Sequence, residues 1–297
     1  MRVPRLLPLL TGVAIGLPIL AGCAAPADGG SGAPATGAAS PSGAATSSTS
    51  CDKGSLTLVK AGTLTLGTDK PAYPPWFVDD TPSNGKGYEA AVGAAIAEKL
   101  GFAPTEVTWV VVPFNTAIAP GPKNFDLDLN QISISEERKQ AVDFSSGYYD
   151  VTQAVVATKS SPIAGKSSVA DLAGAKLGGQ VGTTSYKAIT DQIKPSTKPS
   201  VFDTNDLAVQ ALKNGQIDGI VVDLPTAFYM TGAQLDDGVI VGQLPPAGTP
   251  EQFGAVLDKG SALTPCVTQA VDALRADGTL AKLEKQWLAE QGAPELK

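Results

Sequence analysis

Apolar residues along the chain recur with two different spacings, and their alternation predicts the fold class. Short runs rich in branched side chains are typical of strands, and longer stretches with apolar residues every three or four positions are typical of helices. The expected strands are 63–68, 107–112, 127–134, 151–157, 175–180, 201–202, 217–222 and 253–257. The expected helices are 87–100, one starting at Ser135, 185–193, 206–214, 225–231, and two amphipathic helices around Val267–Leu274 and Leu280–Trp287. This order predicts an α/β fold with mostly parallel sheets flanked by helical crossovers.

The strands fall into two groups, which predicts two lobes. After Tyr149 a strand follows with no helix behind it, and 160–168 is polar and contains glycine and proline. A second α/β unit begins there, and the last strand and helices return to the first. We therefore expect residues 51–153 and 252–297 in one lobe, 154–251 in the other, and a hinge of two connecting strands.

One segment, Phe125 to Arg138, combines a buried strand with an expected helix start. Ser135 is a typical N-cap, and acids follow it in the first turn. Ligands of open α/β sheets bind where such strands end, and the N–H groups of a helix start attract anions. Arg138 is therefore a candidate ligand for a carboxylate, which a guanidinium holds through two parallel hydrogen bonds. The alternative is a surface arginine paired with Glu136 or Glu137.

Composition narrows the classes of function. The chain has 297 residues, 43% of them hydrophobic, which is enough for one large or two medium domains. It contains no histidine, which excludes histidine-based triads and most zinc sites. Its net charge of −7 makes nucleic acid an improbable partner. We expect no metal and no cofactor.

The N-terminal residues have the features of an export signal. Arg2 and Arg5 precede an apolar stretch that runs from Leu6 to Leu20, and small residues then lead to Cys23. This end is similar to the lipobox of bacterial lipoproteins, so we expect a signal peptide over 1–22 and a lipid on Cys23. A transmembrane anchor is the alternative, although the apolar stretch is short and contains proline. Residues 23–50 are nearly all small and polar, which predicts a flexible tether.

Two cysteines, Cys51 and Cys266, remain once Cys23 is assigned to lipid. In an exported chain two spare cysteines favour a disulfide, which would tie the start of the folded part to its last helices. Two free buried thiols are the alternative.

Several short motifs, taken in order, resemble those of the bacterial extracellular solute-binding proteins of family 3, which serve amino-acid ABC transporters. They are Gly67-Thr68-Asp69, Tyr73-Pro74-Pro75, Gly87-Tyr88-Glu89, Ile132 to Arg138, Val142 to Ser145, Tyr148-Tyr149, Gly182-Thr183-Thr184 and Ala276 to Thr279. The resemblance covers nearly all of residues 51–290. It implies a type II periplasmic-binding-protein fold in which an amino acid binds between the lobes.

The resemblance also implies roles for individual residues. Arg138 matches the arginine that holds the ligand carboxylate, and Asp223 matches the acid that takes the α-ammonium, although Asp223 could instead cap the next helix. Thr183 and Thr184 match a helix start that meets the same carboxylate. The other matching positions are Ser133 as a donor beside the ligand, Tyr73 and Phe114 as the aromatic pair around its aliphatic part, and Asp69 as the acid facing its side chain. By themselves these four would be interpreted as strand, core and turn residues.

Two positions bear on the ligand's identity. Gln131 stands where the family usually has glycine, so we expect its carboxamide to enter the cleft. Gln180 occupies a position that varies with ligand class. Together with Asp69, which would repel an acidic side chain, these amides favour a polar neutral or cationic amino acid.

The implied function is capture of an amino acid and its delivery to a membrane permease driven by a cytoplasmic ATPase. We expect a monomer without catalytic activity, anchored by lipid to the outer face of the cell membrane. Two alternatives remain open: a dehydratase, since enzymes acting on prephenate-like acids resemble this fold, and a sensory ligand-binding module.

Overall fold

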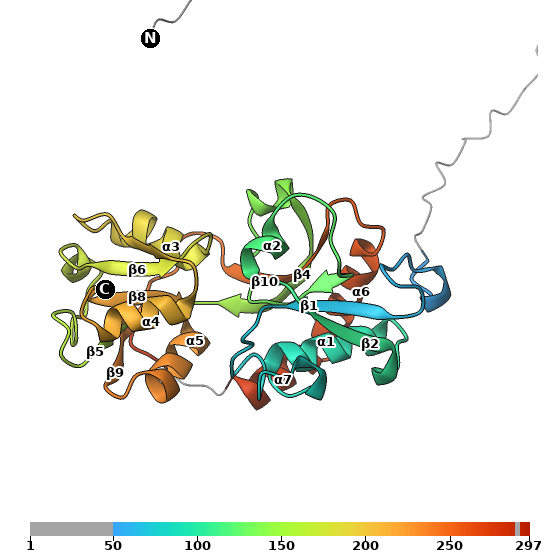
Figure 1. Ribbon diagram of the computed structural model, residues 1–297, viewed down its shortest axis with the longest axis horizontal. Helices are drawn as coiled ribbons and strands as arrows, with labels where there is room; N and C mark the ends of the chain where they lie inside the picture. The colour runs from blue at the N-terminus through green and yellow to red at the C-terminus, as the bar shows by residue number, and fades with distance from the viewer. Residues whose placement is uncertain (1–49, 289–291) are drawn as a thin grey trace, which may run out of the picture. The chain divides into compact units, whose positions relative to one another are not determined.

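The computed structural model describes residues 50–288 and 292–297, which form two five-stranded sheets with helices packed on them (Figure 1). The predicted signal peptide, Cys23 and nearly all of the tether lie outside the described residues. Within the described part, no helix has both the length and the apolar character needed to cross a bilayer.

The first sheet has the strand order β2-β1-β3-β10-β4. Strands β1, β2 and β3 run parallel, whereas β10 is antiparallel to both β3 and β4. The strands are β1 (Leu64–Thr68), β2 (Val107–Val111), β3 (Leu127–Asp128), β4 (Val142–Val151) and β10 (Glu251–Asp258); the helices are α1 (Tyr88–Lys99), α2 (Phe114–Ile118), α6 (Thr264–Ala276) and α7 (Thr279–Trp287). Helix α1 contacts both α6 and α7. We call this sheet and its helices the first lobe.

The second sheet repeats the arrangement, with the order β7-β6-β8-β5-β9. Its first three strands are parallel, and β5 is antiparallel to its two neighbours. The strands are β5 (Gln153–Thr158), β6 (Leu177–Gln180), β7 (Ser200–Phe202), β8 (Gly219–Asp223) and β9 (Gly238–Gln243); the helices are α3 (Thr184–Ala188), α4 (Asn205–Lys213) and α5 (Leu224–Tyr229), and π-helical turns follow α3 and α5. This sheet and its helices form the second lobe.

The predicted α/β fold is confirmed, but several elements differ from expectation. The strand expected over 127–134 has only two residues in β3, and Arg138–Gln140 is a single 3-10 turn, so the helix expected at Ser135 is wrong. Strands β4 and β9 were not predicted. In β4, Ser145, Ser146 and Gly147 interrupt the apolar pattern, and the strand forms because β10 pairs along its whole length.

The chain passes between the sheets at Thr152, between β4 and β5, and again over 244–250, between β9 and β10. The C-terminal residues differ from the expected lobe boundaries. Glu295 pairs with Gln243 of β9, and Leu296 is 2% exposed in the core of the second lobe. Residues 292–297 therefore belong with the second sheet, which corrects the prediction that all of 252–297 lies in the first lobe.

Cys51 and Cys266 form a disulfide with their Cα atoms 5.3 Å apart. The bond connects the segment before β1 to α6, as the cysteine count predicted. Both cysteines contribute to the core of the first lobe.

Candidate functional site

A cavity of about 150 Å³ lies between the two lobes and is lined by both of them. The lining includes nine of the ten predicted ligand-binding residues: Asp69, Tyr73, Phe114, Gln131, Arg138, Gln180, Thr183, Thr184 and Asp223. Only Ser133 is absent from it. The chain therefore brings together, at one place, side chains that are up to 154 residues apart in the sequence (69 to 223).

Arg138 lies at the boundary of the lobes and is 9% exposed. Its Nη1 donates to the Ser133 carbonyl at 2.6 Å and its Nη2 to the Gly182 carbonyl of the second lobe at 2.8 Å. Gly182 has a φ of +74°, which suits glycine and turns its carbonyl toward the arginine. Burial lowers the pKa of Arg138, while the nearby acids Glu251 and Asp223 raise it; a guanidinium stays charged under such conditions.

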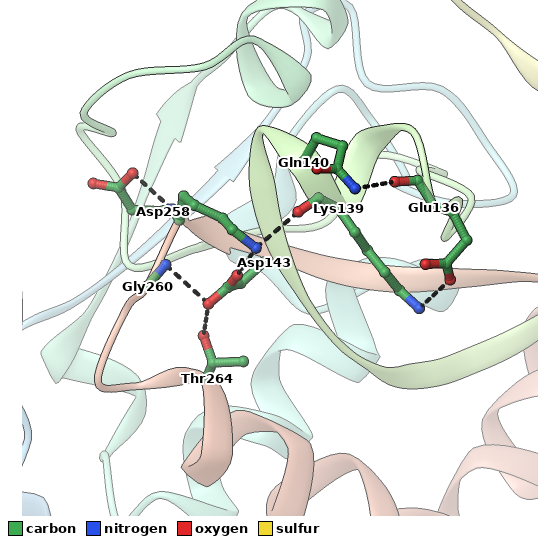
Figure 2. Close-up of polar contacts among 8 residues, drawn as sticks. Glu136, Lys139, Gln140, Asp143, Asp258, Gly260 and Thr264 are labelled. Atoms are coloured by element: carbon green, nitrogen blue, oxygen red, sulfur yellow. Dashed lines mark hydrogen bonds and ion pairs between the residues drawn. The ribbon is translucent and has the colours of Figure 1, made fainter.

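The turn Arg138–Gln140 is connected to the segment after β10 by hydrogen bonds, and Figure 2 shows the polar contacts around Lys139, Asp143 and Gly260. Lys259, from the loop after β10, donates to the Lys139 carbonyl at 2.7 Å and to Asp143 at 3.0 Å. Asp143 also accepts from Gly260 and Thr264. Glu136 pairs with Lys139 at 2.8 Å, whereas Arg138 is buried and donates to two backbone carbonyls, so the alternative of a surface arginine paired with Glu136 or Glu137 does not hold.

Aromatic side chains form the walls of the cavity. The Phe114 ring is 5.5 Å from the Arg138 guanidinium carbon, a distance at which a cation is attracted to the ring. Tyr73 faces Tyr229 of the second lobe, with ring centroids 5.5 Å apart. Trp76, which is 2% exposed, donates across the lobes to Thr226 at 3.1 Å.

The second lobe supplies an acid at the end of β8. Asp223 accepts from Gln153 at 3.0 Å. Burial, together with the nearby Glu251, raises the pKa of Asp223 to about 8, although the hydrogen bond from Gln153 partly opposes this. Asp223 also occupies the N-cap position of α5 but makes no side-chain capping bond, so the alternative role as a helix cap finds no support.

Thr183 caps α3, since its hydroxyl accepts from the Tyr186 N–H at 3.1 Å. Thr184 reaches the first lobe, where its hydroxyl lies 3.2 Å from that of Ser133. Ser133 also donates to Glu251. Ser133 is therefore connected to the lining through its contact with Thr184.

Asp69 lines the cavity, but both of its oxygens are engaged by the backbone. They accept from the N–H of Lys70 at 2.7 Å and of Phe114 at 3.1 Å. Asp69 therefore has the role of a turn residue, which was the alternative to a ligand-binding role. These backbone hydrogen bonds leave its carboxylate less free to contact a ligand.

Gln131 has a φ of +50°, the left-handed conformation that glycine adopts more easily. Its backbone N–H donates to Glu89 at 2.7 Å and its side-chain amide donates to the other oxygen of the same carboxylate. Burial raises the pKa of Glu89 to about 7, against hydrogen bonds from Tyr148 and Gln131 that lower it. The carboxamide therefore lines the cavity while its nitrogen is held by Glu89, instead of projecting freely into the cleft.

Sequence reasoning missed several polar residues of the lining, among them Asn130 and Asp206. Asn130 is 6% exposed and its Nδ2 has no hydrogen-bond partner among the described residues. Asp206 lies in the first turn of α4, just after β7. A signal was available for Asp206, because helix starts that follow parallel strands are the usual ligand-binding positions in α/β sheets.

Two α/β lobes joined by crossing segments, with a cation and an acid from opposite lobes lining one cavity, define a binding protein of the two-lobed type. The chain belongs to the bacterial extracellular solute-binding proteins, family 3, whose model matches residues 64–290. Members of this family are extracytoplasmic.

Individual relatives agree with this membership. The chain is 30% identical to "ABC transporter arginine-binding protein 1" of Escherichia coli over 73% of its own length and 88% of that protein. A solved structure, "An ancestral arginine-binding protein bound to glutamine", is 32% identical with a TM-score of 0.64 and covers 78% of this chain and 100% of that one. The ancestral amino-acid-binding protein AncCDT-1, "a precursor of cyclohexadienyl dehydratase", is 31% identical with a TM-score of 0.62, over 76% and 95% of the two chains.

Proposed function

We propose that this protein captures a free amino acid with a polar neutral or cationic side chain and delivers it to the permease of an ABC importer. The observation that carries the proposal is that Arg138 of the first lobe and Asp223 of the second line the same cavity. Opposite charges in this arrangement match the carboxylate and ammonium of a zwitterion. Relatives named for arginine, cystine and glutamine support the ligand class.

The division of the site between lobes explains how binding drives closure. Arg138 is carried by the first lobe, and Asp223 and Thr184 by the second. An open form would leave the ligand with the partners of one lobe only, so the ligand favours the closed form by the difference in contacts.

The N-terminal features fit this role. A signal peptide over 1–22 and a lipid on Cys23 would place the protein at the outer face of the membrane, with 23–50 as the tether. A monomer is sufficient for this function, because the cavity is formed by one chain.

The proposal is tested by thermal denaturation of the purified protein with each of the twenty amino acids. We expect at least one polar or cationic amino acid to raise the melting temperature, since a ligand that binds only the folded state stabilises it by mass action. An unchanged melting temperature with all twenty would contradict the proposal.

A dehydratase is the second candidate, because the raised pKa of Asp223 is typical of a general acid and because AncCDT-1, although an amino acid-binding protein, is named as a precursor of such an enzyme. Incubation with prephenate or arogenate separates the two functions. Capture alone predicts no product, whereas a dehydratase would release an aromatic product detectable by its absorbance.

A further inference from the structure

Carboxylates outnumber the cations that line the cavity. Asp69, Asp206 and Asp223 face Arg138 and Lys70. The Lys70 side chain is mostly exposed, and its Nζ lies 3.6 Å from the carboxylate of Asp80, a residue that does not line the cavity. If a bound zwitterion engages Arg138 and Asp223, as the proposed function requires, the remaining lining is negative.

The two remaining acids differ in how their oxygens are occupied. Asp69 accepts two backbone N–H groups, whose positions are fixed by the fold. Asp206 accepts only from side chains: the Tyr73 hydroxyl, and the Gln234 amide at 3.0 Å. Side-chain donors can rotate away, and a carboxylate has room for about four hydrogen bonds. Asp206 is therefore the acid that a ligand can reach.

Asp206 is also not the residue that caps its own helix. The N-cap of α4 is Thr204, whose hydroxyl accepts from the Leu207 N–H at 3.3 Å. Beside Asp206, the rings of Tyr73 and Tyr229 form a wall contributed by both lobes. Such rings favour a flat cation such as a guanidinium.

We propose that Asp206 binds the cationic end of the ligand's side chain, taking the place of the Tyr73 hydroxyl as its partner. This inference rests on the proposed function and narrows its ligand class to amino acids with a long, positively charged side chain. Since Asp206 belongs to the second lobe and Arg138 to the first, a cationic ligand would contact the first lobe through its carboxylate and the second through its side chain as well as its ammonium.

Titration calorimetry with L-arginine and L-citrulline tests the inference, because citrulline has the same length and carries a neutral urea in place of the guanidinium. We expect the unmodified protein to bind arginine more tightly than citrulline. Asp206→Asn should weaken arginine about tenfold or more, as for loss of a hydrogen bond between charged groups, and change citrulline by less than about threefold. The matched control is Asp203→Asn, an exposed aspartate of the preceding loop that is absent from the lining; both affinities should stay unchanged.

A second variant keeps the test independent of the aspartate itself. Gln234→Lys places a cation against Asp206, so it should lower the affinity for arginine at least tenfold and leave the affinity for citrulline nearly unchanged. Equal losses for both ligands in Asp206→Asn and in Gln234→Lys would overturn the inference, and so would citrulline or glutamine binding with no binding of arginine. In that last case amino-acid capture itself would stand. If arginine, citrulline, glutamine and the other amino acids all failed to bind, both the inference about Asp206 and the proposed function of amino-acid capture would be overturned.

Discussion

Arg138 of the first lobe and Asp223 of the second line the same cavity, and each side chain is held by hydrogen bonds. The two hydrogen bonds of Arg138 use separate arms of the guanidinium and reach both lobes. A lysine ammonium has the charge but cannot reproduce a planar, two-armed donor. The identity of residue 138 therefore matters beyond its charge.

Arg138→Lys should accordingly weaken the binding of the amino acid identified by thermal denaturation. The expected loss of binding free energy is about 2–5 kcal/mol, which is the scale of losing one partner of a buried charged pair. Titration calorimetry measures this directly. Arg275→Lys is the matched control: Arg275 lies in α6, donates to the Gly147 carbonyl and is absent from the cavity lining, so its replacement should leave affinity unchanged. Equal affinities of Arg138→Lys and the unmodified protein would refute the carboxylate-binding role.

Asp223 predicts a pH dependence with a defined sign. Its pKa of about 8 means that the carboxyl is largely protonated at pH 7 without ligand, whereas an ammonium partner favours the ionised form and lowers the pKa. Binding at pH 7 should then release a proton, and affinity should fall as pH drops from 8 to 6 by at most about tenfold per unit.

Calorimetry at pH 7 in phosphate and in Tris detects that proton, because the two buffers differ in ionisation enthalpy. Asp223→Asn should abolish the buffer dependence. Two results together would exclude the ammonium-binding role of Asp223: equal heats of binding in both buffers, and an affinity that does not change between pH 6 and 8.

At the residue scale, nearly all of the predicted ligand-binding residues line the cavity, but the sequence did not show which partners hold their side chains. The motifs that resemble the family singled out Arg138 and Asp223, and both residues line the cavity. The motifs could not show that Phe114 donates to Asp69 or that Glu89 holds Gln131, because these partners are 45 and 42 residues away in the chain, respectively.

At the scale of elements, the predictions succeeded where local pattern decides the structure. Helix α1 lies within one residue of the range expected from its apolar spacing and from Gly101. Strand β4 escaped prediction because its pairing with β10, more than a hundred residues away, outweighs a serine- and glycine-containing sequence. The position of the C-terminal segment also depends on distant partners.

That segment offers a test of the corrected lobe boundary. Leu296 is buried over Gly242 of β9, where an added Cβ would lie 2.8 Å from the leucine Cγ. Leu296→Ala should reduce the free energy of unfolding by about 2 kcal/mol, the low end for buried leucine, since a chain end can detach. Urea denaturation measures it.

Leu207→Ala is the matched control, because Leu207 is 44% exposed and its loss should cost less than about 0.5 kcal/mol. If Leu296→Ala proved as mild as this control, the C-terminal segment would not be packed on the second lobe in solution.

At the scale of the whole molecule, the Cys51–Cys266 bond closes a loop of 215 residues that includes every strand and helix of the second lobe but not its C-terminal segment 292–297. A crosslink of this kind restricts the unfolded chain, and its removal typically costs about 2–5 kcal/mol. Urea denaturation with and without reductant should show this loss, and the Cys51→Ser, Cys266→Ser double variant should match the reduced protein. Superimposable curves under both conditions would mean that the bond does not stabilise the fold.

The central claim is that the two lobes together grip both charges of a free amino acid. It is tested most directly by calorimetry of the best-binding amino acid beside its Nα-acetyl and α-carboxamide derivatives, each of which lacks one charge. We predict that both derivatives bind at least a hundredfold more weakly than the parent, because each leaves Asp223 or Arg138 without its partner. A derivative that binds as tightly as the parent would contradict the account.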